Sequence, residues 1–273
     1  MVSGKRVLVA AAPQQVSIMW NASQLLIICP LVFVGGLVDA IGGGGGLITV
    51  PAYLIAGCPV HVAIGTNKIS SAMGLSIAFT KFMLNGWIPV KLSAMAVVFA
   101  LTGSSLGAKT ALLISDYVFR IMMLVILPVT AYYVFRSQDL LREEQNSHEE
   151  ITRRTCVVCA LVAFFVGFYD GFYGPGAGTF MLLLLAGAAR LSVQKANGVT
   201  KAINFTTNIA ALAVYFMNGK VIIPLGVIAG VFSIAGNYIG ARFFERGGAK
   251  IVRPVILIVL SLFFVRVIYD LLH

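Results

Sequence analysis

Residues 39–46 read Asp-Ala-Ile-Gly-Gly-Gly-Gly-Gly, and residues 170–178 read Asp-Gly-Phe-Tyr-Gly-Pro-Gly-Ala-Gly. Each stretch interrupts a long apolar run, where a glycine costs a helix about 1 kcal/mol relative to alanine. The apolar segments that follow, 45–57 and 178–189, fall short of the roughly 20 residues that a bilayer crossing needs. The sequence therefore predicts two broken helices, one in each half of the chain.

The composition places the rest of the chain in lipid. Of 273 residues, 59% are hydrophobic and 11% are charged, whereas a soluble domain carries roughly 25% charged residues. This deficit excludes a soluble enzyme, a nucleic-acid-binding module and a disordered chain. We predict an all-α polytopic membrane protein with about eight full transmembrane helices and two short half-helices. The hydrophobic stretches run approximately over residues 22–41, 45–57, 62–84, 88–112, 117–136, 155–173, 178–189, 197–217, 220–241 and 251–271.

The chain also reads as two homologous repeats. With the glycine clusters aligned, Asn85-Gly86 meets Asn218-Gly219, and two Gly-x-x-x-Gly pairs meet at a steady offset of about 131 to 133 residues. We divide the chain into a tail (1–21), a first membrane repeat (22–136), a polar linker (137–154) and a second membrane repeat (155–273). Basic residues in the linker and in the loop 242–253 favour the cytoplasmic side for both, which makes the repeats inverted. A parallel arrangement would put the linker outside.

The charges and cysteines exclude several kinds of chemistry. The net charge is +10, and the basic residues lie singly along the chain. This distribution fits cytoplasmic loops or an anionic substrate and does not fit a nucleic-acid surface. The four cysteines lie in apolar runs, where we expect buried thiols. No hydrolase, phosphate-loop or metal-ligand motif occurs, so we expect neither an enzyme, nor a cofactor, nor a metal.

The glycine clusters are the first candidate for a functional site. A break at membrane depth survives only where its backbone polar groups find partners or face a wet cavity. The start of the short helix that follows leaves free N–H groups, which attract anions. We therefore predict that Gly44, Gly46, Gly176 and Gly178 bind substrate, as short interrupted segments do in transporters. The alternative is close helix packing, the role that we expect for the Gly-x-x-x-Gly pairs.

Two lysines lie inside apolar segments at corresponding positions of the repeats, Lys68 and Lys201. A lysine in a bilayer costs a few kcal/mol, so it usually faces a cavity or a partner. Small polar residues surround both, and helical spacing places several of them on the lysine face. The alternative is a lysine that extends to the membrane surface. With the lysines, the predicted substrate-binding side chains are Thr66, Asn67, Ser71, Asn204 and Asn208.

Asp39 and Asp170 are the acids that precede the two glycine clusters. An acid within a membrane segment can carry a proton or bind a coupling cation. Equally, each could cap the short helix that follows or pair with the lysine of its own repeat. We therefore name both as candidate coupling residues and leave the structural alternatives open.

Four motifs carry a resemblance to a known family. They are residues 39–46 with Pro51 downstream, Gly-Thr-Asn-Lys at 65–68, the stretch from Gly167 to Thr179, and Lys-Ala-Ile-Asn-Phe-Thr-Thr-Asn at 201–208. Together they resemble the TauE/SafE family of sulfite and organosulfonate exporters, also called the toluene-sulfonate uptake permease family. The resemblance covers nearly the whole chain after about residue 24 and is closest to uncharacterised bacterial inner-membrane members. It implies a multi-pass permease of the bacterial inner membrane that moves sulfur-containing anions.

Residues and resemblance together favour a secondary transporter for a small oxyanion such as sulfite or an organosulfonate. Its expected partners are that anion, the lipid bilayer and a coupling proton or sodium ion, without nucleic acid. Two alternatives stay open. The same residues could line a continuous anion channel, or the chain could be a membrane assembly factor that transports nothing.

Overall fold

The computed structural model describes residues 22–115, 117–118, 151–247, 251 and 254. All regular elements among these residues are α-helices, as the composition predicts. They are α1 (Ala22–Gly42), α2 (Gly46–Ile55), α3 (Val60–Leu84), α4 (Val90–Leu112), α6 (Arg153–Phe172), α7 (Ala177–Gly187), α8 (Val193–Met217) and α9 (Ile223–Gly247).

Eight of the ten predicted apolar stretches correspond to these helices, and both short stretches correspond to short helices, α2 and α7. The predicted stretches 117–136 and 251–271 lie almost entirely outside the described residues, as do the tail and most of the linker. Within the predicted linker, residues 151–154 are described, and α6 begins there at Arg153. The number of membrane crossings and the inverted duplication therefore stay predictions.

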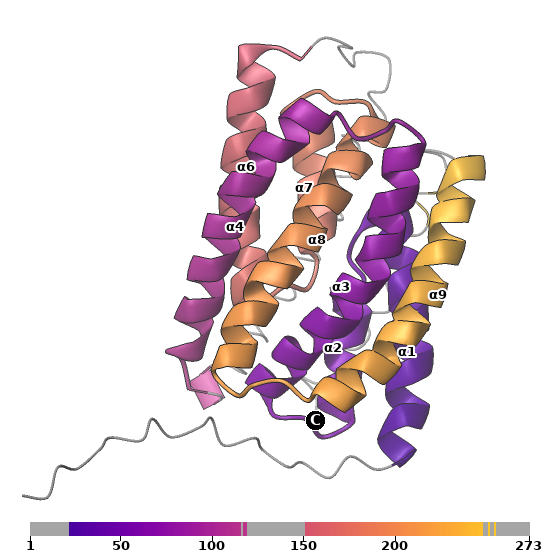
Figure 1. Cartoon of the computed structure of the whole chain (residues 1–273), viewed down its shortest axis with the longest axis vertical. Coiled ribbons are helices and arrows are strands. Elements are labelled where there is room, and N and C mark those ends of the chain that lie inside the picture. The colour runs from indigo at the N-terminus through magenta and orange to yellow at the C-terminus, as the bar shows by residue number, and fades with distance from the viewer. Residues whose placement is uncertain (1–21, 116, 119–150, 248–250, 252–253, 255–273) are drawn as a thin grey trace, which may run out of the picture.

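The two halves of the chain are interleaved, with α3 and α8 in the middle (Figure 1). The first helix of each half packs against the last described helix of the other half, so that α1 lies on α9 and α4 lies on α6. The central helices contact each other, and each also contacts the outer helix of the other half. Residues from both halves therefore meet at the middle of the molecule.

Glycines bring the outer helices into close contact. A Cβ atom at Gly103 or Gly107 would collide with the main-chain oxygen of Phe164 or Phe168 on α6. In α9, a Cβ atom at Gly236 or Gly240 would likewise collide with main-chain oxygens of α1. The packing role expected for these Gly-x-x-x-Gly pairs is confirmed, because only a residue without a side chain lets the backbones approach this closely.

The breaks after α1 and α6 also depend on glycine. Gly43 and Gly44 have φ angles of +74° and +81°, and Gly174 and Gly176 have +97° and +83°. This left-handed backbone is open to glycine at little cost. The two breaks touch, since a Cβ atom at Gly43 would overlap the main chain of Gly178. The broken segments of the two halves thus cross at one point.

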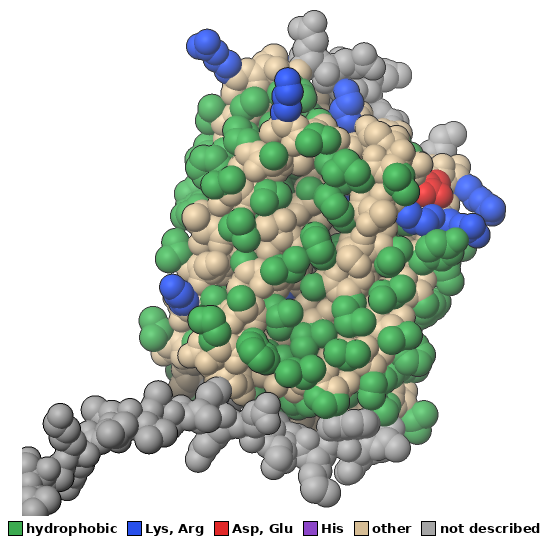
Figure 2. All heavy atoms as spheres, in the orientation of Figure 1, with side chains coloured by type: hydrophobic (Ala, Val, Ile, Leu, Met, Phe, Trp, Pro, Cys, Tyr) green, Lys and Arg blue, Asp and Glu red, His purple; other side chains and the backbone are tan. Residues whose placement is uncertain are grey.

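The outside of the bundle is apolar. Within the described ranges, four helices are long and apolar enough to cross a membrane: Gln24–Gly42, Val90–Leu112, Arg153–Phe172 and Ile223–Gly247. Large hydrophobic side chains are exposed along them, including Phe165 at 64% and Val231 at 58%. Figure 2 shows hydrophobic side chains over most of one face, with most of the visible Lys and Arg side chains in its upper part. Such a surface suits lipid and not water.

Candidate functional site

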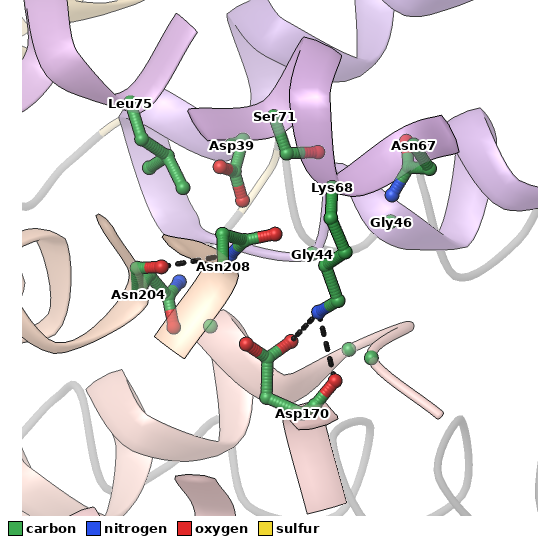
Figure 3. A pocket seen from close by; sticks show the side chains of 13 residues that line it. Asp39, Gly44, Gly46, Asn67, Lys68, Ser71, Leu75, Asp170, Asn204 and Asn208 are labelled. Carbon is green, nitrogen blue, oxygen red and sulfur yellow. Dashed lines mark hydrogen bonds and ion pairs between the residues drawn. The ribbon is translucent and has the colours of Figure 1, made fainter. Parts of the chain in front are cut away.

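A polar cavity lies where the two glycine breaks meet, and we call it the central cavity (Figure 3). It is small and partly open. Both halves of the chain contribute to its wall. The lining residues are Asp39, Gly44, Gly46, Asn67, Lys68, Ser71, Leu75, Asp170, Gly174, Gly176, Gly178, Asn204 and Asn208.

Lys68 reaches from α3 of the first half to the end of α6 in the second half. Its Nζ donates to the main-chain oxygen of Asp170 at 2.8 Å and to Oδ1 of the same residue at 3.0 Å. The Lys68 side chain is 2% exposed and the Asp170 side chain is 6% exposed. Lys68 therefore stabilises the carbonyl end of the broken helix, where the helix dipole favours a cation, and neutralises a buried carboxylate.

Lys201 makes the corresponding contact in the other direction. From α8 its Nζ donates to the main-chain oxygen of Asp39 near the end of α1. Next to it, Asn197 Nδ2 donates to the main-chain oxygen of Ile41 at 2.9 Å. Each broken helix thus ends on a lysine from the opposite half. Both lysines are buried, so the alternative that they extend to the membrane surface is wrong.

The two aspartates use their carboxylates differently. Asp39 Oδ1 accepts a hydrogen bond from the Gly45 main-chain nitrogen at 3.2 Å. Gly45 immediately precedes α2, so Asp39 caps the short helix, as one alternative expected. The other alternative, that each aspartate pairs with the lysine of its own repeat, is wrong for Asp170, whose ion pair with Lys68 joins the two halves.

Several oxygens that line the central cavity have no hydrogen-bond partner within the described part of the chain. They are Asn67 Oδ1, Asp170 Oδ2 and Asn204 Oδ1. Asn208 Nδ2 donates to the main-chain oxygen of Asn204 at 2.7 Å. An unpaired polar atom in a buried wall loses about 1–3 kcal/mol of solvation. All three atoms are hydrogen-bond acceptors, so the partner that each of them lacks is a donor.

Eleven of the thirteen predicted site residues line the central cavity, and two do not. Lys201 acts behind the wall, at the end of α1. Thr66 turns away, and its Oγ1 accepts a hydrogen bond from the Ile222 main-chain nitrogen at 3.0 Å. Leu75 and Gly174, which are not among the predicted site residues, line the cavity as well. Gly174 belongs to the same glycine cluster, whereas nothing in the sequence distinguishes Leu75 from its apolar neighbours.

The cysteine thiols take no part in the central cavity. The four cysteines are free, three of them buried, as expected for structural thiols. Among the described residues, His, Cys, Asp and Glu side chains form no cluster of three or more that could hold a metal ion. The side chains that line the central cavity offer an ammonium group, carboxylates, amides and a hydroxyl.

Comparison with known proteins gives the family. The family model described as sulfite exporter TauE/SafE matches residues 28–267. A probable membrane transporter protein, ORF9, of Sinorhizobium sp is 33% identical, and the match covers 88% of this chain and 91% of the relative. The probable membrane transporter protein YfcA of Escherichia coli K12 is 33% identical, with 88% of each chain covered. A probable membrane transporter protein of Haemophilus influenzae is 32% identical over 87% of this chain and 92% of its own.

No solved structure shows a significant match to the chain. The family match extends from α1 past the end of α9 and includes every residue of the central cavity. The relatives match over most of their own lengths as well, so the similarity concerns whole proteins and not a shared fragment. This chain belongs to the sulfite exporter TauE/SafE family of membrane transporters.

Proposed function

We propose that the protein is a secondary transporter of small anions, that sulfite, an organosulfonate or a related sulfur oxyanion is its substrate, and that the central cavity is its binding site. The buried ammonium group of Lys68 at the meeting point of two broken helices is the observation that carries this proposal. A charge held at that depth is costly unless it serves a partner or a ligand. The family description, which names sulfite, supports the substrate class.

In this proposal the anion binds between Lys68 and the N-terminal ends of α2 and α7. The glycines of both breaks line the cavity, so an anion can approach the main-chain N–H groups without meeting a side chain. Ser71, Asn67, Asn204 and Asn208 add polar side chains around it. Lys201 acts indirectly, because it fixes the end of α1 on which Asp39 and the first break depend.

The interleaved packing suggests how the anion crosses. The helix order and the reciprocal contacts of α1 with α9 and of α4 with α6 support two repeats of opposite orientation. Rocking of one repeat against the other would open the central cavity to one side of the membrane and then to the other. Asp39 or Asp170 would couple this movement to a proton or a sodium ion. We place the protein in the bacterial inner membrane, with multiple crossings.

Flux measurements on the purified protein test this function. Proteoliposomes with the wild-type chain should take up radiolabelled sulfite or a labelled organosulfonate, and Lys68→Met should lower the rate at least tenfold because the ammonium group is lost. Ser71→Ala, a milder change, should weaken apparent affinity severalfold. Lys81→Met is the matched control, because Lys81 is a partly exposed lysine on the same helix.

Each variant must show a single peak on gel filtration and a cooperative melting curve before flux is compared. Wild-type flux in a folded Lys68→Met protein would contradict the assignment of the site. Flux that follows the anion gradient alone, with single-channel steps, would identify a channel instead. An absence of flux for every sulfur oxyanion would leave the assembly-factor alternative.

A further inference from the structure

A second cavity that Asp39 lines lies among α1, α2, α3 and α9, and we call it the Asp39 cavity. It is small and partly open, with space for about one water-sized occupant. Asp39, Gly46 and Ser71 belong to both cavities, so the two are neighbours. The lining residues of the Asp39 cavity are Gly35, Gly36, Asp39, Gly45, Gly46, Thr49, Ser71, Ser233 and Asn237.

Two of these residues present buried oxygens that lack a partner among the described residues, Thr49 Oγ1 and Asn237 Oδ1. Thr49 is 4% exposed and Asn237 is 0% exposed. The orientation of the Asn237 amide follows from its other contact, since Nδ2 donates to the main-chain oxygen of Ser233 at 3.0 Å. The remaining atom is thus an acceptor, and it belongs to a residue that lines the cavity.

The lining of the Asp39 cavity is therefore one carboxylate with neutral oxygens. The Asp39 carboxylate accepts a single hydrogen bond from the described residues, that of Gly45. Ser71 and Ser233 add hydroxyl oxygens. Hard cations prefer such oxygens.

We infer that the Asp39 cavity is a binding site for a monovalent cation, sodium. The ion binds to the Asp39 carboxylate, Thr49 Oγ1, Asn237 Oδ1 and the hydroxyls of Ser71 and Ser233. Ends of interrupted membrane helices hold sodium in other transporters in the same manner, through main-chain carbonyls and carboxylates. Lys201 does not occupy this position, because its Nζ binds the main-chain oxygen of Asp39.

Charge balance suggests that the sodium ion compensates the charge of the transported anion. This role rests on the proposed transport of anions. Lys68 and Lys201 balance Asp39 and Asp170, so these four groups, of which Asp39 is only partly buried, sum to zero when all are ionised. An anion that enters the central cavity alone leaves a net negative charge in a poorly solvating interior. A sodium ion in the adjoining Asp39 cavity removes that charge. Each ion then strengthens binding of the other, which is the linkage that cotransport needs.

The test uses sodium as the only probe and the full chain in detergent, without any anionic substrate. Thermal melting is followed as sodium chloride replaces choline chloride at constant ionic strength, with potassium chloride as a second series. Sodium should raise the melting temperature of the wild type because it binds the folded state. Thr49→Val and Asn237→Leu should each weaken the apparent sodium affinity at least tenfold, and Thr49→Ser, which keeps the hydroxyl, should retain it.

Ser93→Ala is the matched control, because Ser93 also has a buried hydroxyl without a described partner but lies in α4, away from the Asp39 cavity. Its sodium response should equal that of the wild type. Equal melting temperatures in sodium and choline would overturn the inference and leave an ordered water as the occupant. A sodium response that survives both Thr49→Val and Asn237→Leu would overturn it too. Neither result bears on anion flux, so failure of the cation site and failure of the proposed transport are distinguishable.

Discussion

Asp39 and Asp170 stand at the same point of the two halves, each just before a glycine break, yet their surroundings differ. Asp170 lies in an ion pair with Lys68, at 3.0 Å. Asp39 caps α2 through Gly45 and faces the oxygens of the Asp39 cavity. Lys68 neutralises Asp170 through a direct ion pair. Asp39 forms no ion pair among the described residues, so its charge is balanced by more distant cations or by a ligand.

The difference follows from a few substitutions between the halves. In the alignment of the repeats, Ser233 corresponds to Ala100, and Thr49 to Met181. Asn237 corresponds to Ser104, whose hydroxyl donates to the main-chain oxygen of Thr207 at 2.7 Å and so has its own partner. The second half therefore lacks the free oxygens that surround Asp39. The same helical plan can hold different ions in its two halves.

The largest expected effect separates the two aspartates. Asp170→Asn breaks a buried ion pair and leaves Lys68 uncompensated, so it should lower the free energy of unfolding by about 3–5 kcal/mol. Asp39→Asn keeps an amide oxygen for Gly45 and loses only the weaker attraction to cations nearby, so it should cost about 1–2 kcal/mol. Unfolding in a denaturing detergent, followed by circular dichroism, measures both. Equal losses would remove the distinction between the two halves.

A second pair of variants tests the glycine contacts, where the two halves should lose similar stability. Gly107→Ala and Gly240→Ala each place a Cβ atom against the main chain of a neighbouring helix, α6 and α1 respectively. Each should therefore cost about 1–3 kcal/mol through overpacking. Thr102→Ala, on the exposed side of α4, is the control and should change stability little. A large loss at one glycine with none at the other would show that the two contacts are not equivalent.

The helices could be predicted from the sequence because helices that contact lipid are long apolar segments. Glycine clusters, basic loops and apolar length indicated eight described helices, including the short α2 and α7. The central cavity was predictable for a related reason, since polar residues are conspicuous in apolar segments. Lys68, Asn204 and the glycines therefore stood out before their contacts were known.

What the sequence could not supply is which half each side chain contacts. Lys68 and Lys201 were both assigned to the substrate, whereas one lines the cavity and the other holds a helix end behind it. That distinction depends on how the halves interleave, which helical periodicity within one segment does not encode. Asn237 and Ser233 were overlooked because they lie in an apolar helix far from either glycine cluster, and only packing brings them to Asp39.

Thr66 lies on the same helix as Lys68 but does not line the central cavity. A variant at Thr66 therefore tests whether substrate binding depends on contact with the cavity. Its counterpart in the second repeat is Val199, so valine suits the backbone there. Thr66→Val removes the acceptor for the buried Ile222 nitrogen and should cost about 1–2 kcal/mol of unfolding free energy. Sulfite affinity, measured by calorimetry on the folded variant, should stay within twofold of the wild type. A tenfold loss of affinity at unchanged stability would return Thr66 to the binding site.

The smallest effect is expected at Lys81, which has no basic counterpart, since Val214 occupies the corresponding position. Its Nζ lies 3.2 Å from Glu245 Oε1 and 4.6 Å from the ring centroid of Tyr238, and both charged side chains are partly exposed. A partly exposed ion pair contributes at most about 1 kcal/mol and weakens with salt. Lys81→Met should thus lower stability by less than about 1 kcal/mol, and the loss should shrink further in 1 M salt. A salt-independent loss as large as that of Asp170→Asn would contradict this expectation. It would mean that solvent exposure does not distinguish Lys81 from the buried Lys68.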